Sequence, residues 1–108
     1  MHIDIITLFP DMLAGPLSES ILKRAQEKGK VSLKIHNLRN WTQDKHKTVD
    51  GRPFGGGPGM VMMIEPIDKA LKDLRKVDSH VILTSAKGAQ YKQTRAQELS
   101  KKEHLIII

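Results

Sequence analysis

One stretch of the chain combines glycines, prolines and an aromatic ring in a pattern that suits close contact with a phosphate or a base. Residues 52–60 read Arg-Pro-Phe-Gly-Gly-Gly-Pro-Gly-Met. The glycines leave backbone N–H groups open to a ligand, and the prolines limit how far the segment can flex. No Lys-Ser or Lys-Thr follows it, as in a Walker loop, and no strand immediately precedes it, as in a dinucleotide-binding fingerprint. The composition favours a ligand-binding loop over a flexible linker.

A second candidate segment lies just upstream, where residues 44–50 read Asp-Lys-His-Lys-Thr-Val-Asp. The Asp50 carboxylate can accept hydrogen bonds from the N–H edge of a guanine, and His46 can stack on a base or donate to a phosphate. Taken alone, however, His46 is more typical of an ordinary surface histidine. His46 and Asp50 lack an obvious third partner for a metal ion, so we assign no metal ligand.

A third segment, residues 83–88, reads Leu-Thr-Ser-Ala-Lys-Gly between a predicted strand and a predicted helix. In open α/β sheets, ligands bind beyond the carboxyl ends of the strands. Backbone groups between Leu83 and Ala86 could therefore bind the edge of an adenine, although an ordinary strand–helix connection is the more common explanation of such residues. No serine lies in the nucleophile-elbow pattern of the α/β hydrolases.

Positive charge gathers around the first two segments. The chain carries 18 Lys or Arg against 12 Asp or Glu, a net charge of +6, and residues 30–60 hold six Lys or Arg against two Asp, or +4 of that total. Trp41 and Phe54 add rings, so groups that contact phosphates coincide with groups that stack on bases. A solvated loop with incidental charges explains the same clustering equally well.

Composition also narrows the class of protein. The 108 residues suffice for one domain and include no cysteine, which excludes a disulfide scaffold, a thiolate zinc site and a cysteine nucleophile. The longest apolar runs, such as Leu105–Ile108, are far too short to span a membrane. Asp4 stands where an export signal would carry Lys or Arg. We expect a cytoplasmic protein with an anionic partner.

The elements that position these segments follow the order β-α-β-loop-α-β-α-β. Apolar patterns predict strands at 3–9, 31–36, 80–84 and 105–108, and helices at 17–28, 65–76 and 91–100. The near-continuous first and last strands predict coverage on both faces. Residues 37–64 have no clear period and predict a long functional or disordered loop. The fold class is α/β, a largely parallel sheet with flanking helices. Because the last strand leads into no loop, we expect the chain to be the amino-terminal piece of a longer protein.

Taken together, these segments resemble the bacterial tRNA (guanine-N1)-methyltransferase (TrmD) family over the whole chain. The resemblance is carried by Ile-Ile-Thr-Leu-Phe-Pro at 5–10, Arg-Asn-Trp-Thr at 39–42, and residues 44–50 running into 52–60. It implies the amino-terminal portion of a knotted SPOUT methyltransferase domain, with the knot beyond residue 108, in a cytoplasmic homodimer. It also implies methyl transfer from S-adenosylmethionine to N1 of the guanosine 3′ of the tRNA anticodon.

The resemblance implies roles for individual residues. The anticodon loop would meet a substrate-binding set comprising His46, Asp50, Arg52, Phe54, Gly55, Gly56, Gly57 and Gly59. The methyl donor would meet a donor-binding set comprising Leu83, Thr84, Ser85, Ala86 and Gly88. Ala86 stands where the family usually has proline, which removes rigidity from that loop, and Phe54 keeps the ring of the family's usual tyrosine.

The resemblance places no catalytic residue in this chain. The family's aspartate base, its other donor-binding loops and its tRNA-clamping carboxyl-terminal domain are all expected beyond Ile108. The family's transfer step is also linked to Mg²⁺, for which these residues indicate no site. We therefore expect the isolated chain to be inactive and to bind the donor weakly or not at all. A standalone RNA- or nucleotide-binding α/β module without catalysis is the alternative interpretation.

Overall fold

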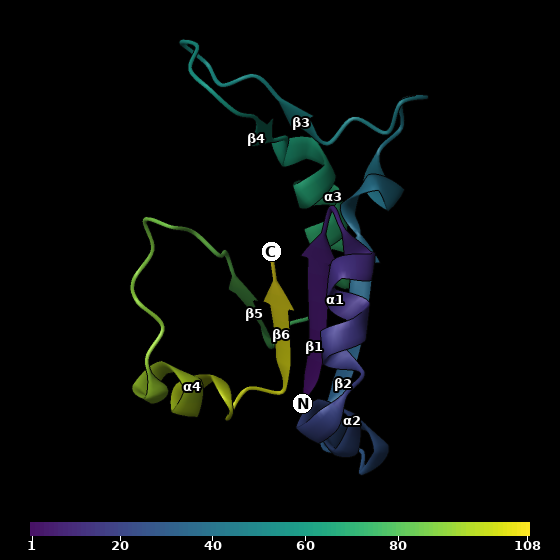
Figure 1. Ribbon diagram of the computed structural model, residues 1–108, viewed down its shortest axis with the longest axis vertical. Helices are drawn as coiled ribbons and strands as arrows, with labels where there is room; N and C mark the ends of the chain where they lie inside the picture. The colour runs from purple at the N-terminus through teal and green to yellow at the C-terminus, as the bar shows by residue number, and fades with distance from the viewer.

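A four-stranded sheet runs through the centre of the chain, and the computed structural model describes every residue from Met1 to Ile108 (Figure 1). The strands lie in the order β2 (Ser32–Asn37), β1 (His2–Thr7), β6 (His104–Ile107) and β5 (Ser79–Ile82). All three neighbouring pairs are parallel. The expected α/β class with a largely parallel sheet is therefore confirmed. Parallel neighbours need long crossover connections, which usually contain a helix.

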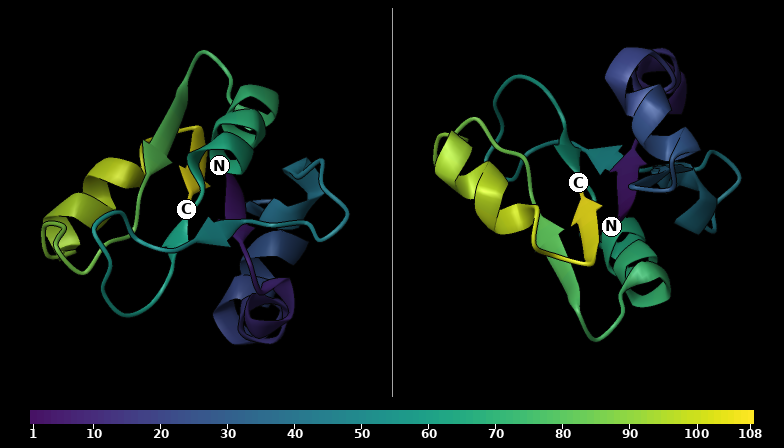
Figure 2. Two further views of the ribbon diagram at one scale, coloured as in Figure 1. Left: turned by 90° about the horizontal axis from the view of Figure 1, so that it is seen from above. Right: turned by 90° about the horizontal axis from the view of Figure 1, so that it is seen from below.

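Helices cover both faces of this sheet. Figure 2 shows α3 (Ile64–Leu74) on one face, and α1 (Pro10–Leu17) with α2 (Ser20–Glu27) on the other. The short α4 (Gln93–Leu99) packs at the β5 edge. No helix in this chain combines the length and the apolar character that crossing a bilayer requires.

The hydrophobic core lies between α3 and the sheet. Ile6 of β1 and Ile106 of β6 are buried there beside Ala70 of α3. Leu38 and Val49, from the segment that follows β2, are fully buried and complete the cluster. The first half of the predicted loop, residues 38–49, is therefore attached to the core at both of its ends.

The predicted long loop is more ordered than its sequence indicates. It begins with the 3-10 helix η1 (Leu38–Trp41) and contains a two-stranded antiparallel sheet of β3 (Asp50–Gly51) and β4 (Val61–Met62). The glycine-rich residues are thus the tip of a β-hairpin, which we call the glycine hairpin (residues 50–62). Strands this short give too little alternation for a periodicity argument to detect them.

Two predicted helices differ from the structure. Residues 17–28 do not form one helix, because α1 starts at Pro10 and ends at Leu17 before α2 begins. Pro10 opens α1 at a position whose N–H would have no helical partner, so it starts a helix as well as ending the strand. The predicted helix at 91–100 starts later, at Gln93, and Tyr91 is exposed rather than directed into the core.

Candidate functional site

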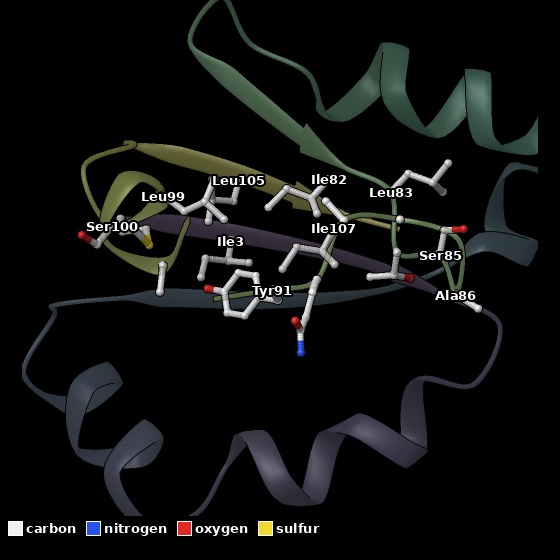
Figure 3. A pocket seen from close by; sticks show the side chains of 16 residues that line it. Ile3, Ile82, Leu83, Ser85, Ala86, Tyr91, Leu99, Ser100, Leu105 and Ile107 are labelled. Atoms are coloured by element: carbon white, nitrogen blue, oxygen red, sulfur yellow. The ribbon is translucent and has the colours of Figure 1, made fainter. Parts of the chain in front are cut away.

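A cavity of about 830 Å³ lies on the sheet face opposite α3 and extends from Met1 and Leu105, at the amino ends of β1 and β6, to the loop after β5 (Figure 3). Eleven of its 16 lining residues are hydrophobic. The lining includes the complete donor-binding set: Leu83, Thr84, Ser85, Ala86 and Gly88. We call this space the donor cavity, and its size is typical of a pocket for a small organic ligand.

Hydrogen bonds fix the loop that borders the donor cavity. The backbone N–H and the hydroxyl of Thr84 both donate to the carbonyl of Ile108, each at 2.8 Å. The Gly88 N–H donates to the Ser85 carbonyl at 3.1 Å, and a Cβ at position 88 would lie only 3.2 Å from that same oxygen. Thr84 therefore anchors the loop to the end of the sheet, and Gly88 permits its tight turn.

The floor of the donor cavity was missed by the sequence analysis. It is an apolar sheet surface that includes Ile3, Ile82 and Ile107, whose side chains point into the space in Figure 3. The expected coverage on both faces is confirmed for β6, where the consecutive residues His104, Leu105 and Ile106 are all buried, but only in part for β1, where Ile3 is half-buried beside the cavity. Alternate residues of a strand share a face, so the isoleucines at 3 and 107 mark this surface in the sequence.

The substrate-binding set lies mainly in the glycine hairpin. Gly55, Gly56, Gly57 and Gly59 all have positive φ, between 82° and 111°, and a Cβ on any of them would meet nothing within 4 Å. The glycines are thus needed for their backbone conformation and not for lack of space. Phe54 projects fully into solvent beside them. The tip presents bare backbone and one exposed ring, which suits contact with a planar, phosphorylated partner.

The segment before the hairpin is organised by Asp44. Its carboxylate accepts hydrogen bonds from the Thr48 hydroxyl at 2.6 Å and from the Thr48 N–H at 3.0 Å, which closes a turn around His46. The hydrogen bond from the Thr48 hydroxyl is the main reason that the pKa of Asp44 lies below its ordinary value. Desolvation acts in the opposite direction and raises this pKa. Asp44 is therefore a structural residue, and it leaves the exposed His46 at the surface of the turn.

The donor-binding and substrate-binding sets line different cavities. Arg52 and Phe54 border a separate apolar cavity of about 390 Å³ formed with residues of β4 and the start of α3. In Figure 1 the glycine hairpin stands above the carboxyl ends of the strands, while the loop after β5 lies to one side. The whole donor-binding set therefore lines one cavity, whereas only Arg52 and Phe54 of the substrate-binding set share the other, and the two sets do not meet in one pocket.

A polar cluster lies on the core-facing side of the sheet, with His2 and His104 at the amino ends of β1 and β6 and His36 farther along β2. Asp4 is 3% exposed, and its carboxylate lies 2.6 Å from Nε2 of His36, 2.8 Å from Nε2 of His104 and 3.1 Å from Nε2 of His2. Burial raises the pKa of Asp4, but the bonds from His36 and His104, with the charge of His2, hold it below its ordinary value. The sequence analysis missed this cluster, which joins three strands distant in the chain.

Comparison with known proteins identifies the family. A profile of the family described as tRNA (Guanine-1)-methyltransferase TrmD matches residues 1–108. Proteins named tRNA (guanine-N(1)-)-methyltransferase from Dictyoglomus turgidum and Carboxydothermus hydrogenoformans are 57% and 52% identical to the chain over its whole length. The alignments cover 44% and 43% of those relatives, so the chain spans less than half their length. This chain belongs to the tRNA (guanine-1)-methyltransferase TrmD family.

Proposed function

We propose that this chain forms the amino-terminal portion of a SPOUT methyltransferase domain that transfers a methyl group from S-adenosylmethionine to N1 of the guanosine 3′ of the tRNA anticodon. The observation that carries the proposal is that the whole donor-binding set lines one cavity, which reaches the carboxyl edge of a parallel sheet. Ligands of open α/β sheets bind at this edge. Family membership supplies the reaction class.

The donor cavity fits the adenosyl part of such a donor. Its isoleucine floor can cover one face of the adenine, and the exposed ring of Tyr91 lies on the lining beside it. Backbone groups between Leu83 and Ala86 can hydrogen-bond the adenine edge. When bound, the donor supplies an electrophilic methyl group, and the residues of this chain bind and orient it.

The glycine hairpin is the proposed contact for the anticodon loop. Its positive-φ glycines present backbone N–H groups without side chains, and Arg52 adds a positive charge for a phosphate. Phe54, fully exposed, can stack on an unpaired base. Asp50 is half-buried in β3 and can accept hydrogen bonds from the N–H edge of the target guanine, a binding role and not that of a base.

The reacting nitrogen must lose a proton as it attacks the methyl group, so the reaction needs a general base. We expect this base outside Met1–Ile108, together with the knot and the tRNA-clamping domain. The residues present do not fit Mg²⁺, because the one group of three potential metal ligands contains two imidazoles, and Mg²⁺ prefers oxygen. Separation of the donor and substrate sets in one chain is consistent with the homodimer expected in the cytoplasm.

The test measures methyl transfer by the full-length gene product that contains this chain. The substrates are labelled S-adenosylmethionine and a tRNA transcript with guanosine 3′ of the anticodon. We expect N1-methylguanosine at that position, and no product from a matched transcript that carries adenosine there. The control protein is Met1–Ile108 alone, which we expect to be inactive. Tight tRNA binding by the full-length protein without any transfer would instead support a binding module and overturn the proposal.

A further inference from the structure

Three potential metal ligands converge near the amino ends of β1 and β6, on the face of the sheet opposite the donor cavity. Nε2 of His2, a carboxylate oxygen of Asp4 and Nε2 of His104 lie within 4.8 Å of one another. Asp4 and His104 are buried, whereas the side chain of His2 is 34% exposed. One oxygen of Asp4, Oδ2, lies 3.1 Å from the nitrogen of His2 and 2.8 Å from that of His104. Two buried ligands and one ligand open to solvent therefore surround a single point.

These distances are close to those of a metal centre. Zinc bonds to imidazole nitrogen and carboxylate oxygen are about 2.0 Å long, so neighbouring ligands of a tetrahedral ion lie about 3.3 Å apart. The observed separations of 3.1 Å and 2.8 Å must open by a few tenths of an ångström, and the two imidazole nitrogens, which lie within 4.8 Å of each other, must come to about 3.3 Å. The partly exposed ring of His2 can supply this movement without a change in the buried core.

Neighbouring groups already orient the two buried ligands as metal sites require. The second nitrogen of His104, Nδ1, lies 2.6 Å from the Ser79 hydroxyl, which in turn accepts the Lys76 N–H at 2.7 Å. The other oxygen of Asp4, Oδ1, lies 2.6 Å from Nε2 of His36. In metal sites, a ligating histidine donates its other N–H to an oxygen, and a ligating carboxylate is itself hydrogen-bonded.

We propose that His2, Asp4 and His104 bind a divalent cation of the Zn²⁺ class, with a fourth position open to water on the His2 side. Two imidazoles and one carboxylate suit Zn²⁺ and disfavour Mg²⁺, so this site is separate from the family's Mg²⁺ requirement. With the ion on Nε2 of His104, Nδ1 carries the ring proton and donates a hydrogen bond to the Ser79 hydroxyl oxygen. The ion then links the amino ends of β1 and β6.

The test titrates ZnCl₂ into the intact protein after EDTA has removed bound metal, with isothermal calorimetry as the measurement. We expect one equivalent of Zn²⁺ to bind at micromolar concentration and to be lost in His2→Gln and in His104→Gln. The His2→Gln variant alters a partly exposed side chain, so it keeps its fold even if the buried substitution does not. MgCl₂ should give no binding that depends on His2.

Matched controls come from the two histidines outside the cluster. His80→Gln changes a histidine on the same sheet, and His46→Gln changes one in the exposed turn. Both variants should still bind one equivalent of Zn²⁺. Co²⁺ in place of Zn²⁺ should give the visible bands of tetrahedral nitrogen and oxygen ligation, which His2→Gln abolishes. Absence of zinc binding would overturn the proposal, as would zinc bound equally by wild type and His2→Gln.

Discussion

The two ends of the parallel sheet are built on opposite principles. At the carboxyl end, the loop after β5 that borders the donor cavity and the glycine hairpin present backbone groups and apolar surface that the chain itself leaves uncovered. Nearer the amino end, the polar side chains of Asp4 and its three histidines are in contact with one another, and no buried polar side-chain atom lacks a partner. One end is open to ligands, and the other holds the strands together.

The two ends differ in the property that a substitution changes, which is either the free energy of folding or the binding of a ligand. Removing one member of a buried, mutually satisfied cluster leaves its partners without hydrogen bonds, which costs folding free energy. Altering an open backbone surface removes little from the folded state and acts mainly on a ligand. Substitutions near the amino end should therefore change stability, and substitutions at the carboxyl end should change binding.

The largest effect is expected for Asp4→Ala. The substitution leaves the buried rings of His36 and His104 without their acceptor, so we expect a loss of about 3 kcal/mol in the free energy of unfolding. The measurement is urea unfolding in the presence of EDTA, which excludes any contribution from bound metal.

Asp68→Ala is the matched control for this effect. Asp68 also pairs with a cation, Lys72, but both side chains are more than half exposed. Exposed pairs four residues apart on a helix contribute only about 0.3–0.5 kcal/mol. Equal losses in the two variants would mean that the contrast between the buried cluster and the surface does not govern stability.

The next largest effect is expected for Gly57→Ala in the glycine hairpin. Gly57 has φ of 111° with open space around it, so alanine strains the backbone without a clash. The left-handed region costs a residue with Cβ about 1–2 kcal/mol, so the binding-competent hairpin becomes scarcer. We expect tRNA affinity of the full-length protein to fall about 5- to 30-fold, as measured by filter binding.

Gly15→Ala provides the opposite control. Gly15 lies inside α1, has open space around it and has no positive φ, so alanine meets no neighbouring atom there. Because Pro16 follows and disfavours a helical residue with Cβ before it, we expect no gain in stability, and we expect unchanged tRNA affinity. Equal tRNA affinities for the two variants would contradict the role of the hairpin backbone.

The sheet was predictable because its strands carry enough residues to show a pattern. The runs around Ile6 and Ile106 are long and β-branched, so both their existence and the parallel α/β class follow from the sequence. The start of α1 was not predictable by periodicity, because Pro10 is compatible both with the end of a strand and with the first turn of a helix.

The candidate site divides in the same way. The donor-binding set from Leu83 to Gly88 is contiguous in sequence, so a motif could locate it, and the structure places all of it on one cavity. The floor and the histidine cluster join residues from opposite ends of the chain, such as Asp4 and His104. Their proximity depends on the strand order and register, which no local pattern contains.

A smaller effect is expected for Tyr91→Ala at the donor cavity. Tyr91 lines the cavity yet is 68% exposed, so its removal should leave the free energy of unfolding nearly unchanged. Loss of one aromatic contact with the donor is worth about 1 kcal/mol, or roughly a fivefold weaker affinity for S-adenosylmethionine. Equilibrium dialysis with the full-length protein measures it. Tyr91→Phe keeps the ring and should bind normally, and a loss equal to that of alanine would exclude a ring contact.

The smallest effect concerns the pH dependence of the turn at Asp44. Hydrogen bonding from Thr48 lowers the pKa of Asp44, so folding favours its ionised form. The stabilisation is complete above the ordinary value of 3.8 and is lost as pH falls through the lower folded-state pKa. The NMR shift of the Thr48 amide should therefore titrate with a midpoint below 3.8. Thr48→Val removes the hydroxyl donor and should raise that midpoint. A wild-type midpoint at or above the ordinary value would show that the turn is open in solution, and that the carboxyl-end surface is less ordered before it meets a ligand.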